Sequence, residues 1–164
     1  MRALHGVVSL VLLSLAPPAL AQLRNRSISV ESGISAPLSV PAHANPALAL
    51  TATAWLDGSA EAVFRVGLGA APETAGRAAA AVVSGTAGLR VSLLPEPLRP
   101  QLGVELGWAR VRGTEGAADR LALGATAGLE WFPARDLSVT ARAALRGAGP
   151  ALSFELVLAL AAYF

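Results

Sequence analysis

The segment 153–164 alternates in character, and this alternation constrains the fold more than any other feature of the chain. In SFELVLALAAYF the even positions are Phe, Leu, Leu, Leu, Ala and Phe, whereas the odd positions begin with Ser and Glu and continue with smaller residues up to Tyr163. A period of two residues is that of a β-strand with two different faces. One face is continuously apolar and the other holds a carboxylate. The segment is therefore predicted to be a strand that separates an apolar from a polar environment.

The same alternation recurs along the chain, and turn signals such as Asp57-Gly58 interrupt it. Eight segments are predicted to be strands: residues 27–35, 47–56, 60–69, 84–94, 101–112, 120–132, 137–146 and 153–164. The run 78–83 before the fourth strand is rich in alanine, which is a poor strand former. Either an earlier start of the strand or a short helix remains open there.

The connections between these strands fall into two classes. Those near residue 57, at 95–100 and at 133–136 are tight, whereas those at 36–46, 70–77 and 113–119 are longer. The fourth connection on the longer side, at 147–150, is unusually short. An even number of antiparallel strands with short connections on one side and longer ones on the other is typical of a transmembrane β-barrel. Because lipid offers no hydrogen bonds, the strands must close into a ring. The predicted fold is all-β, an eight-stranded antiparallel up-and-down transmembrane barrel.

The N-terminal segment has the composition of a secretory signal peptide. Arg2 precedes an apolar run at 7–15, and Ala19-Leu20-Ala21 resembles an A-x-A cleavage site. The run is too short to span a bilayer as a helix. We therefore expect residues 1–21 to be a cleaved signal peptide and residues 22–164 to be the barrel domain.

Composition excludes several classes of function. The chain has no cysteine, and all 13 of its basic residues are arginine, with a formal net charge of +2. This is no basic patch, so nucleic acid is not expected as a partner. After removal of the signal peptide one histidine, His43, would remain, which cannot form a zinc site without cysteine. No metal and no cofactor is predicted.

The residues opposite the apolar stripes predict what fills the barrel. In a membrane barrel the apolar face points outward, and an eight-stranded interior is just wide enough to be packed by side chains. Charges of both signs would balance there, because an unpaired buried charge costs several kcal/mol. A closed lumen is expected. The predicted lumen ion-pair network consists of Glu31, Arg65, Arg90, Glu105, Glu130, Arg142 and Glu155.

Aromatic residues gather at the predicted strand ends, which is typical of the two aromatic girdles of a membrane barrel. The predicted girdle residues are Trp55, Trp108, Trp131, Phe132, Phe154, Tyr163 and Phe164. Arg110, Arg112 and Arg120 flank the third longer connection, where guanidinium groups could bind lipopolysaccharide phosphates. Ordinary solvated loop charge is the alternative interpretation of these arginines.

Taken together, the signal peptide, the eight strands, the EWFPARDL strand-turn-strand at 130–137 and the terminal Tyr163-Phe164 resemble the small OmpA/OmpX-like outer-membrane β-barrels. This resemblance implies the outer membrane of a Gram-negative bacterium, contact with its lipid and lipopolysaccharide, and recognition of strand 153–164 by the barrel assembly machinery. It implies a non-enzymatic role that is structural, stabilises the envelope or anchors a partner. No protein partner is identified by the sequence.

Two other functions remain open. Eight-stranded barrels resembling PagP and PagL modify lipid A, and His43, with Ser35 and Ser39 upstream, could serve as a general base for such acyl chemistry. A soluble lipocalin-like periplasmic barrel that carries a small apolar ligand is the other alternative. It would require the apolar faces of the strands to point inward.

Overall fold

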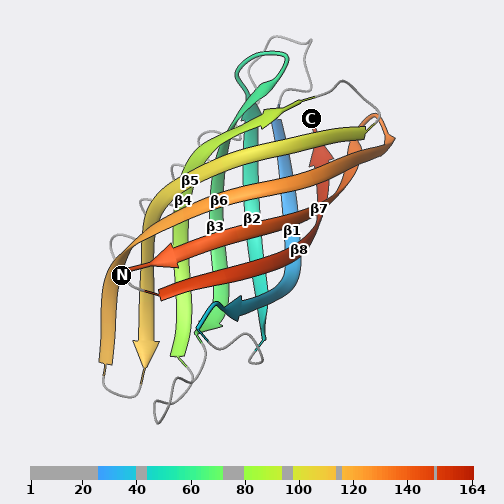
Figure 1. Cartoon of the computed structure of the whole chain (residues 1–164). Coiled ribbons are helices and arrows are strands. Elements are labelled where there is room, and N and C mark those ends of the chain that lie inside the picture. Colours follow the sequence, from blue (N-terminus) through green and yellow to red (C-terminus); the bar gives the residue numbers. More distant parts are fainter. Residues whose placement is uncertain (1–25, 40–43, 72–79, 94–97, 114–115, 150) are drawn as a thin grey trace.

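The computed structural model describes residues 26–39, 44–71, 80–93, 98–113, 116–149 and 151–164. Eight antiparallel strands close into a barrel in which each strand pairs with its neighbours in sequence and β1 pairs with β8 (Figure 1). The strands are β1 (Arg26–Pro37), β2 (Asn45–Trp55), β3 (Ala60–Ala71), β4 (Ala80–Ser92), β5 (Leu98–Gly113), β6 (Gly116–Ala134), β7 (Leu137–Ala148) and β8 (Ala151–Tyr163). The predicted eight-stranded antiparallel barrel is confirmed.

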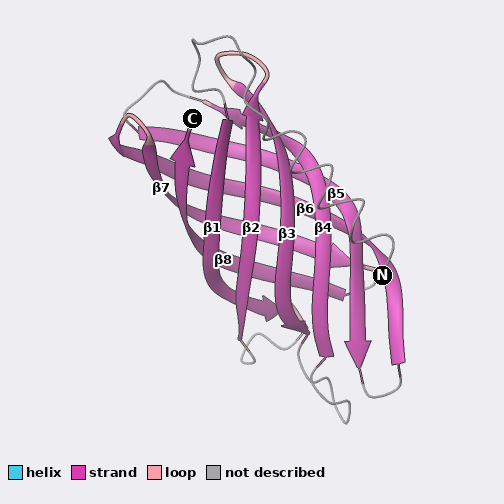
Figure 2. Cartoon of the chain, turned by 180° about the vertical axis from the view of Figure 1, so that it is seen from behind, coloured by secondary structure: helices cyan, strands magenta, loops and turns pink. Residues whose placement is uncertain are grey.

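The two rims of the barrel differ in their connections. The terminal rim carries Arg26, Phe164 and the β2–β3 and β6–β7 turns, and the backbones of Arg26 and Phe164 hydrogen-bond to each other there. The opposite rim, here called the loop rim, carries the β1–β2, β3–β4, β5–β6 and β7–β8 connections. Both figures show the strands inclined across the barrel, and the β5–β6 hairpin extends well beyond the β7–β8 connection (Figures 1 and 2). The predicted signal peptide and His43 lie outside the described residues.

The alternation read from the sequence becomes an inside and an outside. On β8, Val157, Ala159 and Ala161 are buried, whereas the intervening leucines are exposed, with Leu158 at 63%. Large exposed apolar side chains occur on every strand, and the buried set is dominated by polar and charged residues. This is the reverse of a soluble lipocalin-like barrel and is the surface expected of a barrel in lipid. No helix among the described residues is long and apolar enough to cross a membrane.

Three strands begin three or four residues before their predicted starts. β4 begins by Ala80, so the described part of the 78–83 run is strand rather than helix. β6 begins at Gly116, inside the expected 113–119 connection. β5 begins at Leu98 and includes Pro100, which we expected in the turn. Pro100 lies just beyond the last pair of the β4–β5 ladder, Ser92 with Gln101. Its carbonyl accepts from Leu93 N at 2.9 Å, and the hydrogen bond that proline cannot donate falls beyond the end of β4, where it is tolerated.

The β2–β3 turn lies where the Asp57-Gly58 signal predicted it, but it uses a different geometry. Residues 56–59 form the connection. Among the described residues, neither Gly58 nor any non-glycine residue has a positive φ. A two-residue type I′ hairpin needs a positive φ at both central residues, so this turn is of another kind. Instead, Asp57 Oδ1 accepts from the backbone N–H groups of Ser59 and Ala60, each at 2.7 Å. These donors hold the pKa of the Asp57 carboxyl below its ordinary value. The turn therefore loses this stabilisation only in acid, as the carboxylate protonates.

Close approach of neighbouring backbones explains an inward glycine. A Cβ on Gly33 of β1 would collide with Leu156 O and Val157 Cα of β8. Glycine at this position therefore permits the tight β1–β8 contact that closes the ring.

Candidate functional site: the charged lumen

Glu31 lies at the centre of the polar interior. Its side chain on β1 is fully buried. Oε1 accepts from Arg142 Nη1 at 2.8 Å and from Thr51 Oγ1 at 2.7 Å, and Oε2 accepts from Arg65 Nε at 2.9 Å. These donors come from β7, β2 and β3, so one carboxylate joins walls of the barrel that are far apart in sequence. Such charge-assisted bonds are the strongest that side chains make.

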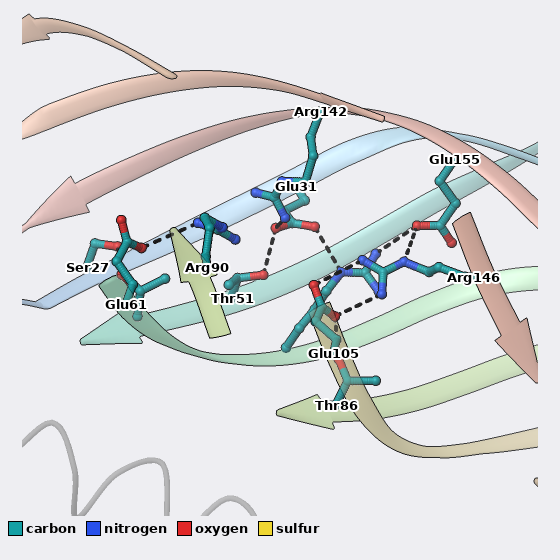
Figure 3. A network of polar contacts seen from close by, with 12 residues as sticks. Ser27, Glu31, Thr51, Glu61, Thr86, Arg90, Glu105, Arg142, Arg146 and Glu155 are labelled. Carbon is teal, nitrogen blue, oxygen red and sulfur yellow. Dashed lines mark hydrogen bonds and ion pairs between the residues drawn. The ribbon is translucent and has the colours of Figure 1, made fainter. Parts of the chain in front are cut away.

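The pairs continue toward the loop rim (Figure 3). Arg65 Nη2 also reaches Glu155 Oε2 at 3.3 Å, and Arg146 Nε donates to the same oxygen at 2.7 Å. Arg146 Nη1 then donates to Glu105 Oε2 at 2.8 Å, an oxygen that also accepts from Thr86 Oγ1 at 2.7 Å. The result is a continuous chain of alternating charges across the lumen. We call it the loop-side network; it consists of Glu31, Arg65, Glu105, Arg142, Arg146 and Glu155.

A second group of polar residues lies closer to the terminal rim. Glu130 accepts from Gln101 Nε2 at 2.6 Å, from Ser138 Oγ at 2.6 Å and from Tyr163 Oη at 2.7 Å. Glu61, on β3, forms an ion pair with Arg90 of the adjacent β4 at 3.5 Å. In this part of the lumen Glu130 is held by neutral donors, in contrast to the carboxylates of the loop-side network.

The structure places all seven predicted network residues inside the barrel, and it adds members that sequence reasoning left out. The loop-side network joins five of the seven, whereas Arg90 and Glu130 lie in the terminal group. Glu61, Arg99 and Arg146 were missing from the prediction. Strand parity could have found them, because each lies an even number of residues from an inward side chain on its own strand. With them, the described interior holds charges in equal number: Glu31, Glu61, Glu105, Glu130 and Glu155 against Arg65, Arg90, Arg99, Arg142 and Arg146.

Three predicted girdle residues lie on the inward face instead of the outer surface. Tyr163 is only 8% exposed and bonds to Glu130, and Phe132 packs against it with ring centroids 5.4 Å apart. The Arg99 guanidinium lies 5.0 Å from the Trp55 ring centroid and 4.7 Å from that of Phe132. The prediction was wrong for these residues because it used their position along the strand without their parity. Together they line the terminal end of the lumen.

The remaining girdle residues point outward. Trp108, Trp131, Phe154 and Phe164 are exposed on the outer surface near the strand ends. Their amphipathic or apolar rings lie where the edge of an apolar belt would meet a bilayer interface.

The three arginines of the expected lipopolysaccharide contact do not share one face. Arg110 and Arg112 have the outward parity of Trp108, and Arg110 pairs with Asp119 at 3.8 Å in an exposed position. Asp119 also accepts from Trp108 Nε1 at 3.1 Å. Arg120 is exposed too, but it has the inward parity of Ala122, and its side chain lies against Gly149, just after β7 at the loop rim. Arg120 therefore belongs to the inward face, whereas Arg110 and Arg112 belong to the outward face.

Within the described ranges no group of three or more His, Cys, Asp or Glu residues could hold a metal ion. His43, the candidate general base, lies outside these ranges, so its position relative to Ser35 and Ser39 is not described. The arrangement that the structure does describe is a charge-balanced, hydrogen-bonded interior. Chemically it can hold the barrel walls together and oppose the passage of ions.

No protein-family model matches the sequence, and no curated protein matches it. Solved structures do. Neisserial surface protein A (NspA) superposes with a TM-score of 0.65 at 12% identity, covering 85% of this chain and 96% of that one. The chain has the fold of the small eight-stranded outer-membrane β-barrels.

Two further outer-membrane barrels support this assignment. The N-terminal barrel domain of Pseudomonas aeruginosa OprF matches with a TM-score of 0.59 at 13% identity, over 84% of this chain and 97% of that one. The outer membrane enzyme PagL matches with a TM-score of 0.58 at 14% identity, over 82% of this chain and 98% of that one. The OmpA/OmpX-like resemblance is thus confirmed at the level of fold. Since one neighbour is an enzyme, the barrel fold alone does not decide the function.

Proposed function

We propose that this protein resides in the outer membrane of a Gram-negative bacterium as a small, closed, non-enzymatic barrel that stabilises the envelope or anchors a partner. The observation that carries the proposal is the loop-side network, which crosses the lumen inside an apolar outer belt. Paired guanidinium and carboxylate groups oppose the entry of an ion, because its passage would require breaking buried ion pairs. The similar outer-membrane barrels support the localisation.

The proposal predicts that the purified protein does not form a stable channel. Reconstituted into planar bilayers, it should show no steady single-channel currents, because eight strands leave an interior that side chains can fill. The control is a variant in which Arg146 and Arg65 are replaced by alanine, which removes bridges to Glu105, Glu155 and Glu31. Steady currents from the unmodified barrel would contradict a closed lumen and favour transport.

The competing lipid A-modifying function gives a second prediction. It requires a general base, and the candidate is His43. We expect lipid A to have the same acylation pattern, by mass spectrometry, in cells with the normal protein, with His43→Ala and without the protein. A pattern that changes with expression and reverts in His43→Ala would establish the enzyme instead.

Lipid and lipopolysaccharide are the proposed surroundings, and the assembly machinery is the proposed partner of strand 153–164. Arg110 and Arg112 support contact with lipopolysaccharide phosphates, since both project outward next to the exposed Trp108. The double variant Arg110→Ala/Arg112→Ala should retain less lipopolysaccharide after purification than Arg135→Ala, an exposed arginine of the β6–β7 turn at the opposite rim. Equal amounts of retained lipopolysaccharide would show that Arg110 and Arg112 are ordinary solvated loop charges.

A further inference from the structure

The first residues of β6 have a strand neighbour on one side only. β5 pairs with β6 up to Gly113 and Gly116 at the hairpin end, whereas the pairing of β6 with β7 begins at Ala122. Beyond the bond from Gly149 N to Leu121 O, at 3.2 Å, no described strand continues on the β7 side. Residues 116–120 are all exposed, and both figures show this part of the hairpin standing clear of β7 (Figures 1 and 2). The segment 116–120, here called the open edge, therefore has one side without a described partner.

The open edge presents backbone donors and acceptors. In an antiparallel sheet the N–H and C=O of successive residues point alternately to the two sides of a strand. Because Leu121 O points to the β7 side, the N–H and C=O groups of Ala117 and Asp119 point to that side too. Those of Ala118 and Arg120 point to β5. A row of such groups is a template for pairing with a strand of another chain.

Two copies of the open edge fit each other in one antiparallel register. A twofold axis normal to the sheet brings the same edge of both copies together and keeps their outward side chains on one face. With the axis at Ala118, Ala117 of each copy lies opposite Asp119 of the other copy, and each of these pairs exchanges both of its hydrogen bonds. An axis at Asp119 would place two carboxylates opposite each other, which is destabilising. The register centred on Ala118 is therefore favoured.

The side chains of this register are complementary in charge. Arg112 of β5 pairs with Ala117 of β6, and both have outward parity. Because the Ala117 side chain is short, Arg112 can extend over it to Asp119 of the other copy. Within its own chain Asp119 contacts Trp108 Nε1 at 3.1 Å and Arg110 Nε at 3.8 Å, both through Oδ1. Oδ2 is thus left to accept from a second guanidinium, and the twofold axis produces this contact twice.

We propose that the open edge binds the same edge of a second copy of this chain in an apposed membrane. In a single membrane every copy runs β6 from the loop rim toward the terminal rim, so antiparallel pairing requires a copy of opposite orientation. The inference rests on the proposed membrane residence and deepens the proposed anchoring role, since the anchored partner is another copy. One short strand binds weakly, but many copies on each surface act together.

Disulfide cross-linking tests the pairing and its register, because the chain has no cysteine of its own. At a non-hydrogen-bonded antiparallel pair, opposite Cβ atoms lie about 4.5–5.5 Å apart, close to the separation that a disulfide needs. In phosphatidylcholine nanodiscs that each hold one barrel, a disulfide joins two discs and so reports contact between separate membranes. Under mild oxidation, Ala118→Cys should form linked dimers at least about tenfold faster than Arg135→Cys, an exposed position at the opposite rim. Equal rates would overturn the inference.

A proline variant tests whether the backbone of the open edge makes the contact. The Ala117 N–H points away from β5, so Ala117→Pro removes a donor of the open edge without removing a bond of the β5–β6 ladder. Added to Ala118→Cys, it should abolish the fast cross-linking, whereas Ala117→Ser should leave it unchanged. Heat-modifiable migration in gels shows that each variant is folded. A folded proline variant that cross-links at the original rate would contradict strand pairing.

A charge exchange tests the second copy as the partner. Asp119→Arg and Arg112→Asp each place like charges together when a variant pairs with itself, so light scattering should show less association of discs. Mixing the two variants restores both opposite-charge contacts and should restore association. Mixed discs that associate no better than either variant alone would overturn the predicted contact. Steady single-channel currents would contradict the closed barrel without affecting cross-linking, so failure of the proposed function is distinguishable from failure of this inference.

Discussion

Replacing Leu158 with arginine is expected to destabilise the barrel by about 2–4 kcal/mol, the range measured for arginine near the bilayer midplane on a lipid-facing site. Leu158 lies in the middle of β8, is 63% exposed on the outer surface and is flanked by Ser32 of β1 and Ala141 of β7. A guanidinium there would have to leave water for hydrocarbon without a paired carboxylate. The free energy of unfolding, from urea titration in phospholipid vesicles with tryptophan fluorescence, is the measurement.

Two control variants separate this effect from others. Ser59→Arg places the same side chain in the exposed β2–β3 turn and should change the free energy of unfolding by less than about 0.5 kcal/mol. Thr140→Ser changes a buried lumen position on β7 with loss of only a methyl group. If Leu158→Arg were as stable as these controls, the outer surface would not face lipid and the soluble barrel would have to be considered again.

Removing Glu31 is expected to have an effect at least as large. Glu31→Leu would leave Arg142 buried without the carboxylate it pairs with at 2.8 Å, and would deprive Arg65 of its bond at 2.9 Å. Breaking a buried pair by removing one partner costs about 3–5 kcal/mol, because the remaining charge is uncompensated. The same urea titration should show a corresponding loss in the free energy of unfolding.

The double variant Glu31→Leu/Arg142→Met tests whether the loss comes from the unpaired charge. It removes both members of the pair, while Arg65 keeps Glu155 at 3.3 Å. Apolar residues in place of a whole buried pair are often neutral or stabilising, so most of the lost stability should return. The contradicting result is a double variant that loses as much unfolding free energy as Glu31→Leu and Arg142→Met lose separately, added together. It would show that the two residues act independently and that their ion pair does not stabilise this part of the lumen.

The sequence by itself determined the number of strands and which of their faces is apolar. Period-two alternation is a local property, and a strand such as β8 displays it within one segment, so Leu158 and Glu155 could be assigned to opposite faces without any tertiary contact. The same parity contained the inward placement of Tyr163, Trp55 and Phe132. That information was present in the chain, but position near the strand ends was given more weight than parity.

Only the tertiary structure decided which side chains meet inside the barrel. Glu31 and Arg142 come together from β1 and β7, and Arg146 reaches Glu105 from β7 to β5, because ring closure and strand stagger set their heights. Alternation gives the face of a residue but not its height along the barrel axis relative to a strand on the opposite wall. The division of the lumen into a loop-side network of ion pairs and a terminal group in which Glu130 is held by neutral donors therefore follows from closure of the barrel, and no local pattern of residues contains it.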